Sequence, residues 1–98
     1  MSTRLRQLAR GRECQIRIPH CCNGDIHTTV GCHYRMPGLS GIGIKPQDLF
    51  IAWGCSACHE AVDTLKSANW TADQLKLMHA EGVFRTQAIL LCEEEISA

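Results

Sequence analysis

Cysteine is the residue type in this sequence that is best suited to binding a metal ion. Cys55 and Cys58 form a Cys-x2-Cys pair at the start of a helix-like segment. Two thiolates at this spacing can bind one tetrahedral ion from a single helical turn, and zinc takes four such ligands. Cys14 and Cys22 flank a short knuckle and are the expected second pair, with Cys21 as the competing ligand. The spacing predicts a structural zinc ion, with buried unmetallated thiols as the alternative.

The segment from Cys55 to His59 also matches the pattern that attaches c-type haem covalently. Three observations disfavour this reading: the second cysteine cluster, which haem would not need, an aromatic content of only 5%, and the lack of an export signal in MSTRLRQLARGR. A thioredoxin-like redox motif is weaker still, because no βαβ pattern precedes the cysteines.

Two histidines add a possible hydrolytic chemistry beside the zinc. His33 ends a β-rich segment, and His59 directly follows the second zinc cysteine. If a strand-loop-strand-helix unit brings them together, one can activate water while the other holds a divalent cation against a phosphate. Each histidine alone would more often be structural.

Size and composition limit how this chain can fold. With 98 residues, 45% of them hydrophobic, it can form one domain but not a deep core, so a bound metal or disulfides would help it fold. The seven cysteines are an odd number, and no secretory signal is evident, so we expect a cytoplasmic protein with metal-bound cysteines. No apolar run has the length of a membrane span.

Charge is distributed unevenly although the formal net charge is zero. The first 17 residues contain five arginines, and three glutamates lie near the other end: Arg4, Arg6, Arg10, Arg12, Arg17, Glu93, Glu94 and Glu95. A basic arm over residues 1–13 can contact phosphates, or it can be a solvated tail. Residues 14–98 are then the single metal-binding domain.

The elements expected to position these residues follow from local patterns. We predict strands over 15–18, 28–34 and 49–53, with a glycine- and proline-rich loop over 37–46. A helix should cover 55–66. A second should begin at the capping box of Thr71 and Gln74 and run to about residue 96, with a kink or break at Gly82 and an apolar face of Leu77, Phe84, Ala88 and Leu91.

The motifs in combination resemble a known family. The run from His33 through Asp48 to Cys55-x2-Cys58-His59 resembles the ββα-metal motif of HNH endonucleases. More narrowly, RGREC, RIP, CNG, His33-x-Arg35, KPxDL and CSACH resemble the small YbcO-like nucleases of lambdoid prophages, which are similar to the recombinase-dependent Ref nucleases. The resemblance implies a small zinc-braced α+β domain with a knuckle, a two-stranded hairpin and C-terminal helices.

The same resemblance implies a function and roles for individual residues. It implies DNA phosphodiester hydrolysis with magnesium or manganese, in a phage or prophage setting that points to a host recombination protein as a partner. His33 would be the general base, Asp48 the middle residue of the motif, His59 a ligand of the catalytic cation and Arg35 a phosphate contact. The chain departs from the pattern at Cys32 and at Asp48. Asp63, one helical turn after His59, could supply the missing carboxylate ligand.

The departures favour a rival reading, a non-catalytic zinc module that binds DNA or a protein. The remaining candidate residues are interpreted as structural. We expect Cys92 to lie in the core and Trp53 and Trp70 to be packing anchors, and we predict no partner for His20, His27 or His79.

Overall fold

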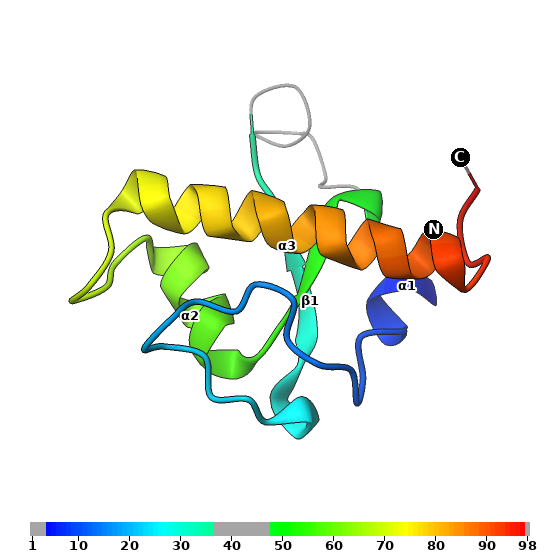
Figure 1. The fold of residues 1–98 in the computed structure, drawn as a ribbon, viewed down its shortest axis with the longest axis horizontal. Helices are drawn as coiled ribbons and strands as arrows, with labels where there is room; N and C mark the ends of the chain where they lie inside the picture. Colours follow the sequence, from blue (N-terminus) through cyan, green and yellow to red (C-terminus); the bar gives the residue numbers. More distant parts are fainter. Residues whose placement is uncertain (1–3, 37–47, 98) are drawn as a thin grey trace.

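The computed structural model describes residues 4–36 and 48–97 and shows a small α+β fold. In chain order the elements are α1 (Arg4–Gln7), the 3-10 turn η1 (Ile26–Thr28), β1 (Val30–His33), the 3-10 turn η2 (Asp48–Phe50), β2 (Ile51–Gly54), α2 (Ser56–Thr64) and α3 (Ala72–Cys92). The long helix α3 lies across the hairpin, with α2 near its N-terminal end and α1 near its C-terminal end (Figure 1). The loop expected over 37–46 lies outside the described residues.

β1 and β2 form an antiparallel hairpin, which confirms the strands predicted within 28–34 and 49–53. Val30 pairs with Gly54 and His33 pairs with Ile51, so the register places His33 beside the start of β2. All four residues of β2 are buried, because α3 packs against this strand. The hairpin thus presents His33 at one end while β2 leads directly into α2 at the other.

The segment 15–18 is not a strand, and this prediction was wrong. Arg17 adopts a left-handed φ of 55°, which an extended strand does not accommodate. Ile16 and Ile18 are nevertheless almost fully buried, at 1% and 0% exposure. The segment is therefore an irregular loop that inserts two isoleucines into the core shared by the hairpin, α2 and α3.

α3 begins as predicted, but it ends earlier than expected. Thr71 Oγ1 accepts the backbone N–H of Gln74, and Gln74 Oε1 accepts the backbone N–H of Thr71, which together form the capping box. The helix ends at Cys92 rather than near residue 96, because Glu94 takes a left-handed φ of 58°. No helix within the described residues has the length and apolarity needed to cross a membrane.

Gly82 does not kink or break α3; it allows the helix to approach the core closely. The helix is continuous from Ala72 to Cys92, and Gly82 is buried within it. A Cβ atom at this position would lie 3.1 Å from the Cα of Ile16 and 3.2 Å from the Cβ of Ala52. Because Gly82 has no side chain, α3 can lie in direct contact with the 15–18 loop and with β2.

The contact at Gly82 also determines which face of α3 is turned toward the core. The predicted apolar face was therefore wrong. Leu77, Phe84 and Leu91 are 61%, 69% and 42% exposed, and Ala88 is exposed as well. The buried face instead includes two polar residues, His79 and Thr86. Thr86 Oγ1 accepts the N–H of Trp53 at 3.0 Å and donates to the carbonyl of Gly82 at 2.8 Å, so its burial leaves no unpaired hydroxyl.

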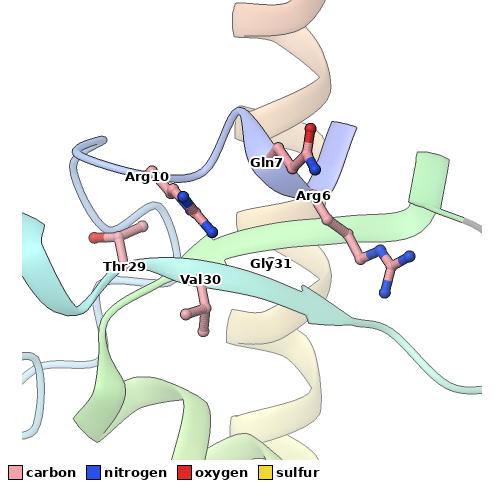
Figure 2. A pocket seen from close by; sticks show the side chains of 6 residues that line it. All are labelled: Arg6, Gln7, Arg10, Thr29, Val30 and Gly31. Carbon is pink, nitrogen blue, oxygen red and sulfur yellow. The ribbon is translucent and has the colours of Figure 1, made fainter. Parts of the chain in front are cut away.

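The N-terminal residues pack onto the domain instead of extending as a solvated tail. Arg4 pairs with Glu95, and Arg12 forms two bonds to Glu93 at 2.6 and 2.8 Å, which ties the two ends of the chain together. The guanidinium of Arg12 also lies 4.6 Å from the ring centroid of the buried Trp53. α1 crosses β1 at Gly31, as Figure 2 shows; a Cβ there would lie 3.5 Å from Cγ of Arg6.

A bulkier residue at position 82 tests this packing. Gly82→Val should lower the free energy of unfolding by about 1–3 kcal/mol, because the added methyl groups must displace Ile16 or Ala52. The measurement is urea unfolding of the metal-loaded protein, followed by circular dichroism. Ala88→Val is the matched control at an exposed position of the same helix, and it should cost less than about 0.7 kcal/mol. Equal losses in the two variants would show that the close approach is not needed.

Candidate metal and phosphodiester-cleavage site

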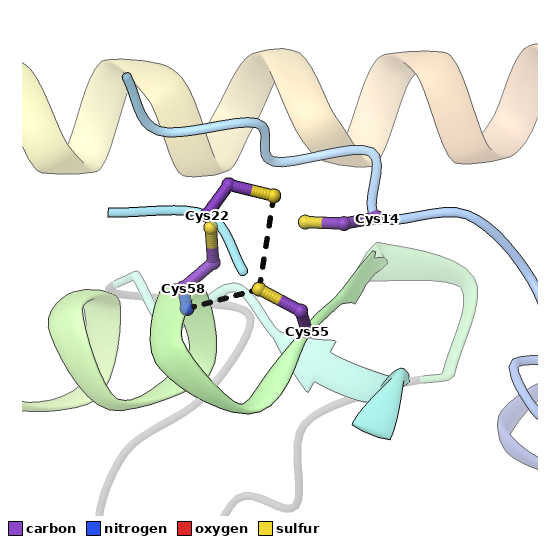
Figure 3. Close-up of side chains that lie close together, drawn as sticks. All are labelled: Cys14, Cys22, Cys55 and Cys58. Carbon is purple, nitrogen blue, oxygen red and sulfur yellow. Dashed lines mark hydrogen bonds between the residues drawn. The ribbon is translucent and has the colours of Figure 1, made fainter. Parts of the chain in front are cut away.

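Four cysteine side chains converge where the 14–22 loop meets the start of α2. The Sγ atoms of Cys14, Cys22, Cys55 and Cys58, called here the cysteine cluster, all lie within 4.8 Å of one another (Figure 3). Among the described residues this is the one group of three or more potential ligands close enough to share an ion. Cys55 and Cys58 are fully buried within it, which favours a shared metal ion over covalent attachment to haem.

The geometry of the cluster fits a tetrahedral ion. A zinc–sulfur distance of about 2.3 Å gives a sulfur–sulfur edge of about 3.8 Å. The Sγ atoms of Cys22 and Cys55 are 3.8 Å apart. Two backbone N–H groups also donate to the sulfurs, from Cys58 to Cys55 at 3.4 Å and from Arg17 to Cys14 at 3.5 Å. The left-handed backbone of Arg17 and the helix start at Cys55 thus orient donors toward the sulfurs, as expected around metal-binding thiolates.

The negative charge of clustered thiolates also favours a bound cation. A hydrogen bond from Cys58 lowers the pKa of Cys14 to about 4, and the same bond raises the pKa of Cys58. Burial, followed by the neighbouring sulfurs, raises the pKa of Cys22 to about 11. Four thiolates cannot be buried together without a compensating positive charge, and a divalent metal ion supplies one.

Two of the three cysteines outside the cluster, Cys21 and Cys92, have separate environments. The thiol of Cys21 points to the carbonyl of Ala57 at 3.5 Å and is not part of the cluster, although it adjoins Cys22. Cys92, expected in the core, is exposed at the end of α3, because the buried face of that helix is rotated away from it.

His33 is held by a carboxylate and, through it, by an arginine. Its Nε2 lies 2.8 Å from Oδ1 of Asp48, and Nε of Arg6 donates to Oδ2 of the same carboxylate at 3.1 Å. The three residues come from β1, η2 and α1, so the fold brings together positions 6, 33 and 48. Asp48 is thus an orienting partner of His33. The contribution of Arg6 was not predicted, because the sequence marked it only as one of several arginines.

His59 and Asp63 form a second polar pair on α2. His59 Nε2 and Asp63 Oδ2 are 3.2 Å apart, one helical turn along the same face. Adjacent ligands of an octahedral ion at about 2.1 Å are separated by about 3 Å, so this pair can provide one edge of a cation site. Magnesium commonly takes few protein ligands and completes its shell with water and substrate phosphate.

One member of each pair lines a small cavity, called here the histidine cavity, of about 150 Å³. It is lined by His33, Tyr34, Arg35, Val62, Asp63, Leu65, Lys76 and His79. His33 and Asp63 therefore face the same space, and the expected phosphate contact Arg35 borders it. His59 does not line the cavity itself and reaches it through Asp63.

Cys32 is directed into the core. Its side chain is 1% exposed, and burial raises its pKa to about 12, so it is a neutral thiol at physiological pH. Its sulfur would lie 2.9 Å from a Cβ on Gly54, which shows how tightly it packs against β2. Cys32 is consequently a packing residue in this structure, and the departure of the sequence at this position removes one ligand from the cavity.

His79 is a further site residue that the sequence did not predict. It is 6% exposed, lines the histidine cavity, and packs edge-on against Tyr34 with ring centroids 5.1 Å apart. Its Nε2 lies 3.0 Å from the carbonyl oxygen of Cys32, so Nε2 carries the hydrogen. Burial lowers its pKa below the ordinary value of 6.5, which keeps the ring neutral. No local sequence signal distinguishes this histidine from the exposed His20 and His27.

Comparison with known proteins identifies the family. A family model described as "Putative nuclease YbcO" matches residues 3–95. The chain belongs to the YbcO family. The chain is also 48% identical over 94 residues to proteins named "Putative nuclease YbcO" from Escherichia coli K12 and from Enterobacteria phage 82, covering 96% of this chain and 97% of each relative. The narrower resemblance drawn from the sequence motifs is thereby confirmed.

A solved structure shares the YbcO-family fold described above. It is titled as a putative bacteriophage protein from Escherichia coli K-12, and it matches with a TM-score of 0.78 at 43% identity. The match covers 93% of this chain and 100% of that structure. The hairpin, the helices and the cysteine-bearing loop therefore belong to a fold that this chain shares with that bacteriophage protein.

Substitution of single cysteines tests the cluster. Cys22→Ser should leave well under one metal ion per chain after purification, because a serine hydroxyl is a much poorer zinc ligand than a thiolate. Elemental analysis measures this directly. Cys21→Ser is the matched control and should retain one ion per chain. Metal loss in Cys21→Ser with retention in Cys22→Ser would contradict the geometry of the cluster.

The buried neutral His79 predicts a pH dependence of stability. Because its folded pKa lies below the ordinary 6.5, the unfolded chain binds a proton that the folded chain excludes. Stability should therefore fall as the pH drops below about 6.5, and His79→Gln should reduce that fall. Unfolding curves across this range measure it, with the exposed His27→Gln as control. An unchanged pH dependence in His79→Gln would contradict the assignment.

Proposed function

We propose that this chain is a zinc-braced, HNH-type endonuclease that hydrolyses DNA phosphodiester bonds with the help of a divalent cation. The observation that carries the proposal is that the oriented His33 and Asp63, the partner of His59, line one cavity. The order β1, β2, α2 matches the arrangement expected for a ββα-metal motif. The names of the relatives, which describe nucleases, support the same class of chemistry.

Zinc in the cysteine cluster would be structural. Four thiolates complete a tetrahedral shell and leave no open position for water or substrate. The cluster also lies at the N-terminal end of α2, whose next turns present His59 and Asp63. The zinc would thus fix the direction of the helix that carries the cation ligands, and the chemistry would occur beside it.

His33 has the partners needed by a general base. An ionised carboxylate only accepts hydrogen bonds, so Asp48 selects the tautomer of His33 with hydrogen on Nε2. Nδ1 is then the atom that takes a proton from the attacking water. Asp48 also stabilises the imidazolium that results, and Arg6 fixes the carboxylate in place.

The remaining cavity residues are suited to handling a phosphate. His59 and Asp63 would hold magnesium or manganese, which when bound neutralises charge that develops on the phosphate and the leaving oxygen. Arg35 and Lys76 border the same space and can attract the substrate anion. The neutral His79 and the edge-packed Tyr34 limit access of water to the inner wall.

A non-catalytic zinc module that binds DNA or a protein is the second candidate. The observation that favours it is the burial of Cys32, which leaves two paired ligands rather than three near the cavity. Cleavage activity distinguishes the two candidates, because the module would bind without cutting.

Replacement of His33 tests the proposed base. With magnesium or manganese present, His33→Ala should reduce nicking of supercoiled plasmid by about 10²- to 10⁴-fold, the usual contribution of a general base. Its zinc content and circular dichroism should match those of the wild type. His27→Ala, which removes an exposed histidine that does not line the histidine cavity, should cut at the wild-type rate. Wild-type cleavage by His33→Ala would exclude this role.

A further inference from the structure

A second polar hollow lies outside the histidine cavity, between α1 and β1. It has a volume of about 380 Å³ and is lined by Arg6, Gln7, Arg10, Thr29, Val30 and Gly31; we call it the arginine groove. Figure 2 shows Arg10 over the Thr29 end of the strand and Arg6 nearer the end that leads to His33. No acidic side chain lines it, and of its two arginines only Arg6 is paired with a carboxylate, that of Asp48 outside the lining.

The structure separates the arginines of the N-terminal region into two groups. Arg4 and Arg12 form ion pairs with Glu95 and Glu93, and Arg17 bonds to the carbonyl of Cys14 and to Gln15. Arg6 and Arg10 face the groove instead.

The two groove arginines retain donors for a ligand. Arg6 uses only Nε for Asp48, and its two terminal nitrogens make no hydrogen bond within the described residues. The guanidinium of Arg10 makes none within the same part of the chain, and the residue is exposed. A guanidinium with unused terminal nitrogens is suited to bidentate binding of a phosphate.

The arginine groove is connected to the proposed base. Arg6 lines the groove and also bonds to Asp48, the carboxylate that holds His33. Arg6 passes close to β1 at Gly31, where an added Cβ would lie 3.5 Å from Cγ of Arg6. From Thr29 to His33 the chain spans four residue steps, about 13 Å. A DNA strand rises about 3.4 Å per nucleotide along the helix axis, so this path covers at most about four nucleotides.

We propose that the arginine groove binds the phosphate backbone of the DNA a few nucleotides away from the phosphate at His33. This inference rests on the proposed function for the identity of the ligand. The groove supplies positive charge and polar donors, Gln7 among them, and contacts to the DNA backbone carry no direct sequence information, so it binds DNA irrespective of sequence. Arg10 is a backbone contact, whereas Arg6 both contacts the backbone and positions Asp48.

The salt dependence of DNA binding tests this assignment. The full chain, zinc-loaded and without added magnesium, is titrated into a fluorescein-labelled 20-base-pair duplex at several salt concentrations. Arg10→Gln should weaken binding about 3- to 10-fold and reduce the slope of log K against log salt by about 0.9, the value for one lost phosphate contact. Arg4→Gln is the matched control. It also removes one positive charge, but from an arginine that is paired with Glu95, so the slope should stay unchanged.

The outcomes separate this inference from the proposed cleavage. Equal effects of Arg10→Gln and Arg4→Gln, no effect of either, or no binding by the wild type would overturn the groove assignment, even if the protein cuts DNA with magnesium. If Arg10→Gln weakens DNA binding and Arg4→Gln does not, but the wild-type protein cuts no DNA, the groove assignment would be supported and the nuclease proposal rejected.

Discussion

Convergence of four cysteine sulfurs, three of them from buried residues, is the constraint on which the rest of this small fold depends. The cluster joins the 14–22 loop to the start of α2, and the loop in turn inserts Ile16 between Gly54 of β2 and Gly82 of α3. A structural zinc contributes about 10–16 kcal/mol in small zinc-binding peptides at neutral pH. Whole domains are stable by only about 5–15 kcal/mol. A 98-residue chain with this cluster is therefore expected to be folded only while its cysteines hold metal.

The candidate site is assembled from segments that pack around the core beside the cysteine cluster. β1 provides His33, η2 provides Asp48, α2 provides His59 and Asp63, and α3 closes the cavity with His79. α1 adds Arg6 from the far end of the sequence. Because each segment contributes one or two groups, small shifts of α2 or α1 would separate the proposed base from its orienting carboxylate or from the proposed cation ligands. The packing is closest at Gly54 and Gly82, where an added Cβ would lie 2.6 Å from Cδ1 of Ile16 and 3.1 Å from its Cα, respectively.

Sequence patterns predicted correctly those features that depend on residues close together in the chain. The capping box at Thr71, the hairpin strands and the Cys-x2-Cys pair at the start of α2 were all readable from neighbouring residues. The predictions were wrong where contacts between segments distant in the sequence determine the structure. Gly82 looked like a helix breaker because the approach of Ile16 leaves no trace in the helix sequence. The leucine and phenylalanine stripe of α3 was assigned to the core although the contact at Gly82 turns it outward, and His79 and Arg6 owe their positions to tertiary contacts alone.

The separation of a structural metal from a catalytic one is the central claim, and cation-dependent cleavage at constant zinc content tests it most directly. Zinc-loaded protein would be incubated with supercoiled plasmid at increasing magnesium concentrations, with zinc measured by elemental analysis before and after. The account predicts no nicking without magnesium, nicking that rises and saturates as magnesium is added, and one zinc per chain throughout. Nicking that is independent of magnesium, or no nicking with either magnesium or manganese while zinc stays bound, would contradict it.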